Sequence, residues 1–421
     1  MVPLKEDIFI LDRDIDRCLI YSPLRGKAFL ADKKSEEVIR RYIRGEYLSE
    51  EERNSAIGNY LAQLEQENVY VPKLKSFNPR GITFVLSNRC NLDCSYCFAK
   101  EYRANVVLSE PKIERLVKDY FASIKRSKYV FTFIGGGEPT MTWGRLQYAI
   151  ESICRHVPND AKLCIAIVTN ATLLTENRLA YLSRLKNIIH ISVSFDVLPD
   201  IQNTTRKYKN TGKNTFEVVH LSLERLKELG ISFSIRSTIT KDNVHRQKEM
   251  VEFIYQNYSP KYIHFEPVTS AENTKEFYMA YVSEFMKAFH AAREYHIILK
   301  NSISNRWQRL NASFCNGELC VTPYGDIFFC HRMASIDQNS QSNVNYGYVT
   351  EENAIVDIEK HRSIVIMQKQ AKCKSCFAQW ICAGGCAAER QMPENVQEMH
   401  CDYVRSMITA LMEYEINIKF N

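Results

Sequence analysis

The sequence predicts an α/β protein in which a partial (β/α)6 barrel lies between a small N-terminal unit and a cysteine-rich C-terminal unit. Six short apolar runs alternate with amphipathic helical patterns between residues 81 and 268, which is the order of a parallel sheet with crossover helices. Three cysteines follow the first apolar run, and eight more lie between residues 315 and 401. We therefore expect three domains, at residues 1–72, 81–300 and 310–421.

The overall composition is that of an ordinary globular chain. Its 421 residues exceed what one small core holds and suit two or three domains. The net charge is only +6, and no arginine-rich run points to nucleic acid. No apolar run approaches the roughly 18 residues of a membrane span, and the start of the chain lacks an apolar secretory core. We therefore expect a cytoplasmic protein without nucleic-acid or membrane partners.

The first 72 residues are expected to fold as a separate module. Three strand-like runs come first, at 8–11, 18–21 and 27–31. A helix over about 35–44 ends at Gly45, and a second helix opens at Ser49 with Glu52 as its capping-box partner. Three strands followed by helices is the order of a small winged-helix module. A structural cap on the barrel is the alternative, and residues 73–80 form the linker.

The central unit contains the expected barrel strands. Their apolar runs lie at 82–86, 129–134, 163–168, 188–195, 231–235 and 262–265. Helical patterns lie between them, and a long helix over 274–294 follows the last run. In such barrels the loops at the carboxyl ends of the strands carry the active site. The three cysteines directly after the first strand are therefore expected at that rim.

These three cysteines, Cys90, Cys94 and Cys97, give the strongest functional signal. Their C-x3-C-x2-C spacing fits within eight residues. Three thiolates leave a four-iron cluster with one iron that lacks a protein ligand, and an open position distinguishes catalytic from structural metal sites. A zinc loop is the alternative, although zinc prefers four nitrogen or sulfur ligands.

The cysteine spacing resembles that of the radical S-adenosylmethionine (SAM) enzymes, and further rim segments are similar to that family. The segment G-G-G-E-P at 135–139 follows the second strand, T-N-A at 169–171 the third, and S-F-D at 194–196 the fourth. The resemblance implies that SAM binds at the open iron and yields a 5′-deoxyadenosyl radical, which removes a hydrogen atom from the substrate. It also implies a SAM site made of Tyr96, Gly136, Gly137, Glu138, Asn170, Ser194 and Arg206.

The C-terminal cysteines resemble the SPASM extension of radical SAM peptide and protein modifiers. Eight thiolates complete two four-iron clusters, which gives three [4Fe–4S] clusters in all; two zinc sites are the alternative. The family's crossed pattern implies that the first auxiliary cluster is held by Cys315, Cys320, Cys330 and Cys386, and the second by Cys373, Cys376, Cys382 and Cys401. The remaining cysteines, expected in the core, are Cys18, Cys154 and Cys164.

The family resemblance implies a maturase that installs an oxidative intramolecular cross-link, thioether or C–C, in a ribosomally made precursor peptide. The N-terminal module resembles recognition elements that bind the precursor's leader at a sheet edge. The auxiliary clusters are expected to take an electron from the substrate as the new bond forms. An external donor such as flavodoxin or ferredoxin is expected to supply the electron for SAM cleavage.

Other functions remain open from the sequence, among them another SPASM oxidase that acts on a small molecule. Sulfatase-maturating members of the family form formylglycine and carry an acidic residue after the cysteine that corresponds to Cys330, where this chain has His331. A non-catalytic zinc-binding interaction protein is the alternative from a different class. By position alone, His331 and Asp196 are the candidate general bases, because histidine accepts protons near neutral pH.

Overall fold

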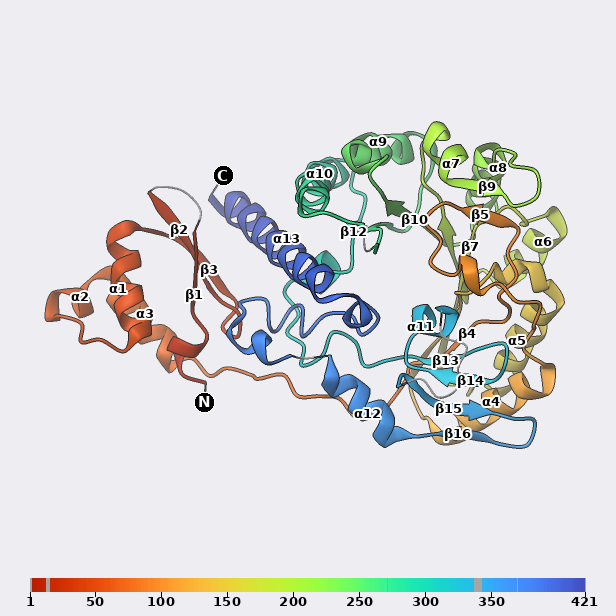
Figure 1. The fold of residues 1–421 in the computed structure, drawn as a ribbon, viewed down its shortest axis with the longest axis horizontal. Coiled ribbons are helices and arrows are strands. Elements are labelled where there is room, and N and C mark those ends of the chain that lie inside the picture. The colour runs from red at the N-terminus through yellow and green to blue at the C-terminus, as the bar shows by residue number, and fades with distance from the viewer. Residues whose placement is uncertain (1, 13–15, 271, 337–342, 369, 421) are drawn as a thin grey trace.

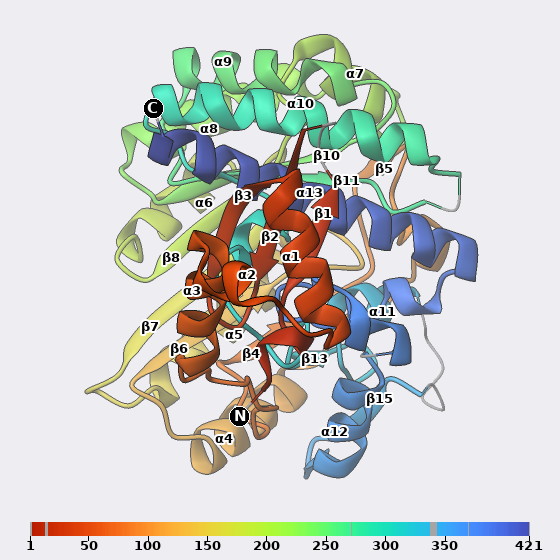
Figure 2. The same cartoon turned by 90° about the vertical axis from the view of Figure 1, so that its left-hand side faces the viewer.

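The computed structural model describes residues 2–12, 16–270, 272–336, 343–368 and 370–420. Figure 1 shows a curved central sheet with helices around its outer side and the N-terminal module at one end. The same module lies in front of the sheet in Figure 2. None of the helices in the described ranges combines the length and the apolar character needed to cross a bilayer.

The N-terminal module has the expected order of three strands and then helices. Its elements are β1 (Phe9–Asp12), β2 (Arg17–Ser22), β3 (Lys27–Asp32), α1 (Lys33–Arg44), α2 (Glu50–Asn54) and α3 (Ala56–Gln66). The strands form an antiparallel sheet in the order β1-β2-β3. Eight buried apolar residues give the module a core of its own, and they include Ile20, Ile39 and Leu61.

The second predicted helix of this module is instead two helices. The capping box of Ser49 and Glu52 is present at the start of α2. The chain then leaves the helical conformation at Ser55, whose side chain accepts a hydrogen bond from the backbone N–H of Gly58 and caps α3. A serine hydroxyl competes in this way with the helix for backbone groups, and the prediction of one continuous helix was therefore wrong.

The central part is a parallel sheet whose strands follow the predicted runs. They are β4 (Ile82–Phe84), β6 (Lys128–Phe133), β7 (Lys162–Thr169), β8 (Ile189–Ser194), β10 (Phe233–Ile239), β11 (Ile263–Pro267) and the short β12 (Leu299–Lys300). The helices that connect them are α4 (Glu110–Ser123), α5 (Trp143–His156), α6 (Glu176–Arg184), α7 (Pro199–Thr205), α8 (Phe216–Glu228), α9 (Gln247–Asn257) and α10 (Lys275–Glu294). Neighbouring strands of this set pair in parallel.

The C-terminal strands continue the same sheet. They are β13 (Leu319–Val321), β14 (Asp326–Phe328), β15 (Asn345–Val349) and β16 (Ala354–Val356). Because β13 pairs with β4 in parallel, the whole is an open 11-stranded sheet in the order β12-β11-β10-β8-β7-β6-β4-β13-β14-β15-β16. The C-terminal helices are α11 (His331–Ile336), α12 (Ile358–Met367) and α13 (Glu394–Phe420). The C-terminal unit is thus joined to the barrel by backbone hydrogen bonds.

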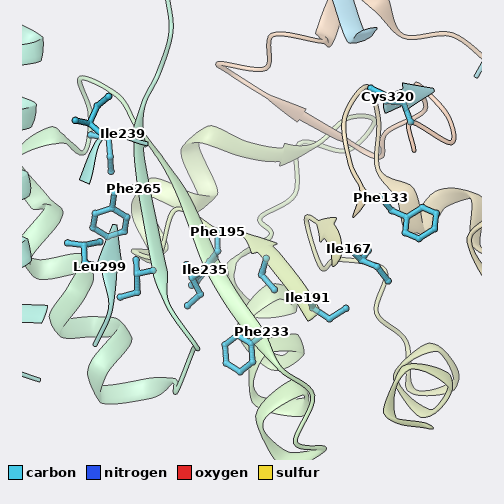
Figure 3. Packing of buried hydrophobic residues seen from close by; sticks show 14 of the residues in the cluster. Phe133, Ile167, Ile191, Phe195, Phe233, Ile235, Ile239, Phe265, Leu299 and Cys320 are labelled. Atoms are coloured by element: carbon cyan, nitrogen blue, oxygen red, sulfur yellow. The ribbon is translucent and has the colours of Figure 1, made fainter. Parts of the chain in front are cut away.

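The parallel sheet has one apolar face and one polar face. Side chains alternate between the faces of a strand, and one alternate set is buried against the helices. This set contains the residues labelled in Figure 3, among them Phe195, Ile235, Phe265 and Leu299. The intervening side chains point to the inner face, and many of them are polar and partly exposed. Water and ligands can therefore reach the inner face.

The three cysteines that were expected in the core have different environments. Cys18 is buried in β2, Cys164 is half-buried in β7, and Cys154 is exposed on α5. The apolar face of α5 consists of Leu146, Ala149, Ile150 and Ile153. Cys154 lies beside this apolar face and not on it. The prediction that Cys154 is a core residue was therefore wrong.

Candidate active site

The cysteine loop is attached to the sheet by a small second ladder. Strand β5 (Leu92–Cys94) pairs antiparallel with β9 (Arg206–Tyr208), and Cys94 lies opposite Arg206. The backbone N–H of Ser95 also donates to the carbonyl of Thr205. The loop after the first barrel strand is therefore held by the segment that follows the fourth.

Asp196 lies at the centre of this attachment. Its carboxylate is fully buried and accepts hydrogen bonds from Nε of Arg206 at 3.0 Å, from the Thr205 hydroxyl at 2.8 Å and from the Tyr96 hydroxyl. The Arg206 guanidinium also lies over the Tyr96 ring, 5.3 Å from its centroid. Removal from water raises the pKa of Tyr96 far above its usual value, which keeps the phenol protonated as a donor.

These contacts show what Asp196 does in this structure. A carboxylate that accepts three side-chain hydrogen bonds has few lone pairs left for a substrate proton. A buried ion pair is strongly destabilised when one partner is lost. Asp196 therefore positions Tyr96 and Arg206, and the geometry gives it a supporting role instead of that of a free base.

The glycine loop after β6 packs directly on the cysteine loop. A Cβ atom added to Gly136 would lie 2.1 Å from Oδ1 of Asn88, and one added to Gly137 would lie 1.9 Å from the carbonyl oxygen of Arg89. Both distances are far below van der Waals contact, and Gly136 in addition has a φ of 55°. Glycine is required here because the two backbones approach closely.

Glu138 turns away from this loop into the protein. Its buried carboxylate accepts from the hydroxyls of Thr140 and Thr169, each at 2.6 Å, and from the backbone N–H of Asn170 at 2.7 Å. Burial raises the Glu138 pKa. In this arrangement Glu138 joins the loops after β6 and β7.

Asn170 and Ser194 complete the rim. The amide of Asn170 donates to Oδ1 of Asn91 at 2.9 Å, and Asn91 belongs to the cysteine loop. Ser194 is half-buried at the end of β8. All seven residues expected to contact SAM thus lie in or beside the loops at one rim, and Asp196, Glu138 and Asn170 connect those loops.

Arg103 is a residue of this site that the sequence analysis missed. Its Nη2 lies 3.5 Å from Sγ of Cys97, while Nε and Nη1 are buried without a hydrogen-bond partner among the described residues. Unpaired buried donors are costly, and electron-rich sulfur or an anionic ligand satisfies them. The residues at this rim therefore fit a thiolate-bound cluster and a ligand with a carboxylate. No spacing rule in the sequence distinguishes Arg103 from a surface arginine.

The eight C-terminal cysteines form two neighbourhoods. Burial raises the pKa of Cys386 to about 12, and the charge of Cys315 adds to this rise. Burial also raises the Cys330 pKa, with further contributions from Cys386 and Cys315, and Cys320 lies close to Cys330. In the second neighbourhood, burial raises the pKa of Cys382 to about 12, with contributions from Cys401, Cys376 and Cys373. The grouping is consistent with the crossed pattern, and the assignment of each set to a cluster stays a prediction.

The close grouping of thiols fits clusters rather than single ions. No three Cys, His, Asp or Glu side chains of the described residues surround one ion position. A four-iron cluster takes its thiolates on separate irons and does not require such convergence. Each thiol must lose its proton to bind metal.

His331, the other candidate base, is paired with an acidic residue that is distant in sequence. Its Nδ1 lies 3.2 Å from both carboxylate oxygens of Glu318, and its backbone N–H donates to the same carboxylate at 3.1 Å. The structure thus supplies a carboxylate next to position 331, although the residue itself is not acidic. Only the pairing of β13 with β14 brings the two residues together.

A second polar group lies at the opposite edge of the parallel sheet. Nε2 of His264 lies 2.7 Å from Oε2 of Glu266, which also accepts from the backbone N–H of Ser302 at 2.9 Å. Arg236 of β10 and Lys300 of β12 flank His264 in the strand register. The alternation of polar and apolar residues in β10 and β11 was the sequence signal for this group.

Comparison with known proteins gives matches in sequence. Residues 84–254 match the radical SAM superfamily. The radical SAM cyclopropyl synthase TigE from Paramaledivibacter caminithermalis is 26% identical over 372 residues, which are 80% of this chain and 75% of that protein. A cysteine-type anaerobic sulfatase-maturating enzyme from Clostridium perfringens is 25% identical over 175 residues, which are 40% of this chain and 46% of that enzyme.

Solved structures share the fold. The structure of anSMEcpe with bound AdoMet has a TM-score of 0.68 at 17% identity and covers 81% of this chain and 99% of that chain. Streptococcus suis SuiB bound to the precursor peptide SuiA has a TM-score of 0.55 at 15% identity and covers 93% of this chain and 97% of that chain. The likeness to SuiB therefore extends over nearly the whole molecule.

The close packing of the glycine loop gives a first prediction. We expect Gly137→Ala to push the glycine loop off the backbone of Arg89 and to weaken SAM binding by at least about tenfold, because its Cβ would overlap a backbone oxygen. Gly144→Ala is the matched control, since a Cβ there meets nothing within 4 Å. Isothermal titration measures the SAM affinity of both variants. Equal affinities in the two variants would contradict the packing argument.

The role of Asp196 gives a second prediction. Asp196→Asn should lower the free energy of unfolding by about 3–5 kcal/mol, because it leaves the Arg206 charge buried without its partner. SAM affinity should fall with it, since Tyr96 and Arg206 lose their fixed positions. Denaturant unfolding and SAM titration test this. A variant with unchanged stability and SAM affinity that fails only in product formation would instead mark Asp196 as the base.

Proposed function

We propose that this chain, whose residues 84–254 match the radical SAM superfamily, is a peptide maturase that installs an oxidative intramolecular cross-link, C–C or thioether, in a ribosomally made precursor. The superfamily assignment also makes the chain an enzyme, and a non-catalytic zinc-binding protein is set aside. The observation that carries the proposal is the extent of the likeness to peptide-modifying proteins. TigE matches over 80% of the chain, and SuiB, which was solved with a precursor peptide, covers 93%.

The residues of the rim have distinct tasks in this proposal. Cys90, Cys94 and Cys97 would hold a [4Fe–4S] cluster, and the rim residues around Tyr96 and Asn170 would bind SAM. When bound, this cluster and SAM supply a 5′-deoxyadenosyl radical that takes one hydrogen atom from the peptide. The chain's own contribution is positioning: Asp196 fixes Tyr96 and Arg206, while Glu138 fixes the glycine loop.

The two C-terminal neighbourhoods account for the second half of the oxidation. A cross-link removes two hydrogens from the peptide, one as a hydrogen atom and the other as a proton and an electron. We assign the two sets of four cysteines to auxiliary [4Fe–4S] clusters that would accept this electron. The Glu318–His331 pair lies beside Cys320 and Cys330 and offers a proton acceptor at that end of the sheet.

The N-terminal module would bind the leader of the precursor. A three-stranded antiparallel sheet has two edges, and an edge strand offers unpaired backbone groups to an extended peptide. The module also contacts the C-terminal unit through ring pairs, including Tyr21 with Trp307 at 6.4 Å and Phe9 with Phe377 at 6.5 Å between centroids. A leader held on this module would therefore lie close to the rest of the enzyme.

Formylglycine formation is the second candidate function. The fold likeness to anSMEcpe has the higher TM-score, 0.68, and a sulfatase-maturating relative matches 40% of the chain. Against this candidate stands His331, which replaces the acidic residue expected after Cys330. A second sulfatase-maturating relative, from Clostridium novyi, is 19% identical over 72% of the chain, so the residue at position 331, and not the length of the match, is what favours the cross-linking function.

The cluster assignment predicts the metal content. Anaerobically reconstituted protein should contain about twelve iron and twelve sulfide per chain, and the triple variant Cys90→Ala, Cys94→Ala, Cys97→Ala about eight of each. Only the wild type should release 5′-deoxyadenosine under dithionite. Iron and sulfide analysis with chromatography measures this. Zinc without sulfide in the triple variant would show that the C-terminal cysteines form zinc sites.

The cross-linking function predicts a mass change in a peptide. We expect co-expression with precursor peptides encoded beside the gene to yield a product lighter by two hydrogen atoms per link and unreactive toward carbonyl reagents. The Cys94→Ala variant is the control and should leave the mass unchanged. A product that reacts with a hydrazide, and that is either two hydrogens lighter (from serine) or carries oxygen in place of a cysteine sulfur, would identify formylglycine. Unchanged masses for every such peptide would refute the proposal.

A further inference from the structure

One transverse row of side chains crosses the inner face of the sheet, from the carboxyl end of β8 through the middle of β10 to the amino end of β11. The register places Ser194 of β8 beside Arg236 of β10, Arg236 beside His264 of β11, and His264 beside Lys300 of β12. Adjacent strands lie about 4.8 Å apart, so neighbouring members of the row are within reach of one ligand. The row begins at Ser194, a residue expected to contact SAM, and runs away from the cysteine loop.

These side chains point to the inner face and not into the core. Their direct neighbours Ile235, Phe265 and Leu299 are buried among the helices, as Figure 3 shows. Since successive side chains alternate between faces, Arg236 and Lys300 lie on the other side. Arg236 is exposed and Lys300 is half-buried there. The row is therefore accessible to a ligand.

The charge of this region is strongly positive. Besides Arg236 and Lys300, the cations Lys261 and Arg309 act on it, while Glu266 is the carboxylate that pairs with His264. Burial lowers the pKa of Lys300, and Arg236, Arg309 and Lys261 lower it further. Burial likewise lowers the pKa of His190 to about 4, with contributions from Lys261 and Lys300. Several groups thus experience the same excess of positive charge.

The guanidinium of Arg236 has no anionic partner in the described part of the chain. Among the described residues, no side chain forms a hydrogen bond or ion pair with its guanidinium. Other arginines of this protein find carboxylates, as Arg246 does with Asp200 at 2.5 Å and Glu249 at 2.7 Å. No carboxylate in the described ranges pairs with the Lys300 ammonium, which lies 3.4 Å from the centroid of the Tyr262 ring. Two cations without anions on an accessible inner face form a site for an anion, and a guanidinium suits a carboxylate.

We propose that Arg236 and Lys300 bind a carboxylate of the peptide substrate, an Asp or Glu side chain or the C-terminus, and so position the residue to be modified. This inference rests on the proposed function, because it takes the ligand of the inner face to be a peptide. SAM also carries a carboxylate, and the row begins at Ser194, which is expected to contact SAM, so the experiment must separate the two sources.

The test compares two peptide pools on the reconstituted holoenzyme with SAM present. One pool is Ac-Xaa-Glu-Xaa-NH2 and the other Ac-Xaa-Gln-Xaa-NH2, where Xaa is any residue except Asp and Glu. We expect equilibrium dialysis with mass-spectrometric readout to show retention of the acidic pool at least about tenfold above the amide pool, because a charged hydrogen bond distinguishes them. The double variant Arg236→Gln, Lys300→Gln should lose this preference.

Two further variants serve as controls. The charge-retaining pair Arg236→Lys, Lys300→Arg should keep the preference, which excludes general damage to the fold. Lys248→Gln, on the outer helix α9, removes a lysine that pairs with Glu252 and should behave as the wild type. No acidic preference in the wild type, or an unchanged preference in the Gln variant, would overturn the proposal.

SAM titration of the same variants separates the two carboxylates. The Gln variant should bind SAM with wild-type affinity; a loss of SAM affinity parallel to the loss of peptide preference would assign the pair to SAM and overturn the proposal. Failure of the proposed function has a different signature. In that case the acidic preference persists, while no co-expressed precursor loses two hydrogens.

Discussion

The buried contact between Asp196 and Arg206 holds the cysteine loop on the sheet. It links the end of β8 to the β5–β9 ladder, and through the Tyr96 hydroxyl it reaches the middle of the cysteine segment. A buried ion pair gains little net stability, because both charges lose their hydration. The ion pair restricts the geometry of the cysteine loop. Any arrangement that separates the two groups leaves a buried charge without its partner and is therefore unfavourable.

The division of the sheet into two faces places the chemistry. One face packs against the helices with side chains such as Phe195 and Phe265, while the other carries Ser194, Arg236 and His264. A radical must be shielded from solvent, and yet its substrate must be recognised by polar groups. The open, curved sheet meets the second need, because its apolar face packs against the helices and leaves its inner face free to carry polar groups.

The pairing of β13 with β4 extends this arrangement into the C-terminal unit. Cys320 lies opposite Thr83 on a strand hydrogen-bonded to the first barrel strand. The cysteine loop follows that same barrel strand. Two paired strands thus carry Cys320 and lead into the cysteine loop. Their relative positions are fixed by backbone hydrogen bonds, which is a more rigid connection than a linker between separate domains.

Local features of the structure were predictable from the sequence. Period-two apolar runs located the six main strands, and Ser49, Ser109 and Thr274 cap helices where their side chains reach a nearby backbone N–H. The cysteine spacing indicated the iron–sulfur chemistry for the same reason, since three ligands within eight residues form one loop whatever the rest of the chain does.

Contacts between distant segments were decided by the tertiary structure. Glu318 beside His331, Cys94 opposite Arg206 and the row from Ser194 to Lys300 all depend on the register of strands that are far apart in the chain. A strand's own sequence determines which residues share a face. Which residues of another strand lie beside them is determined only when the whole sheet packs, because that register depends on the combined burial of all its strands.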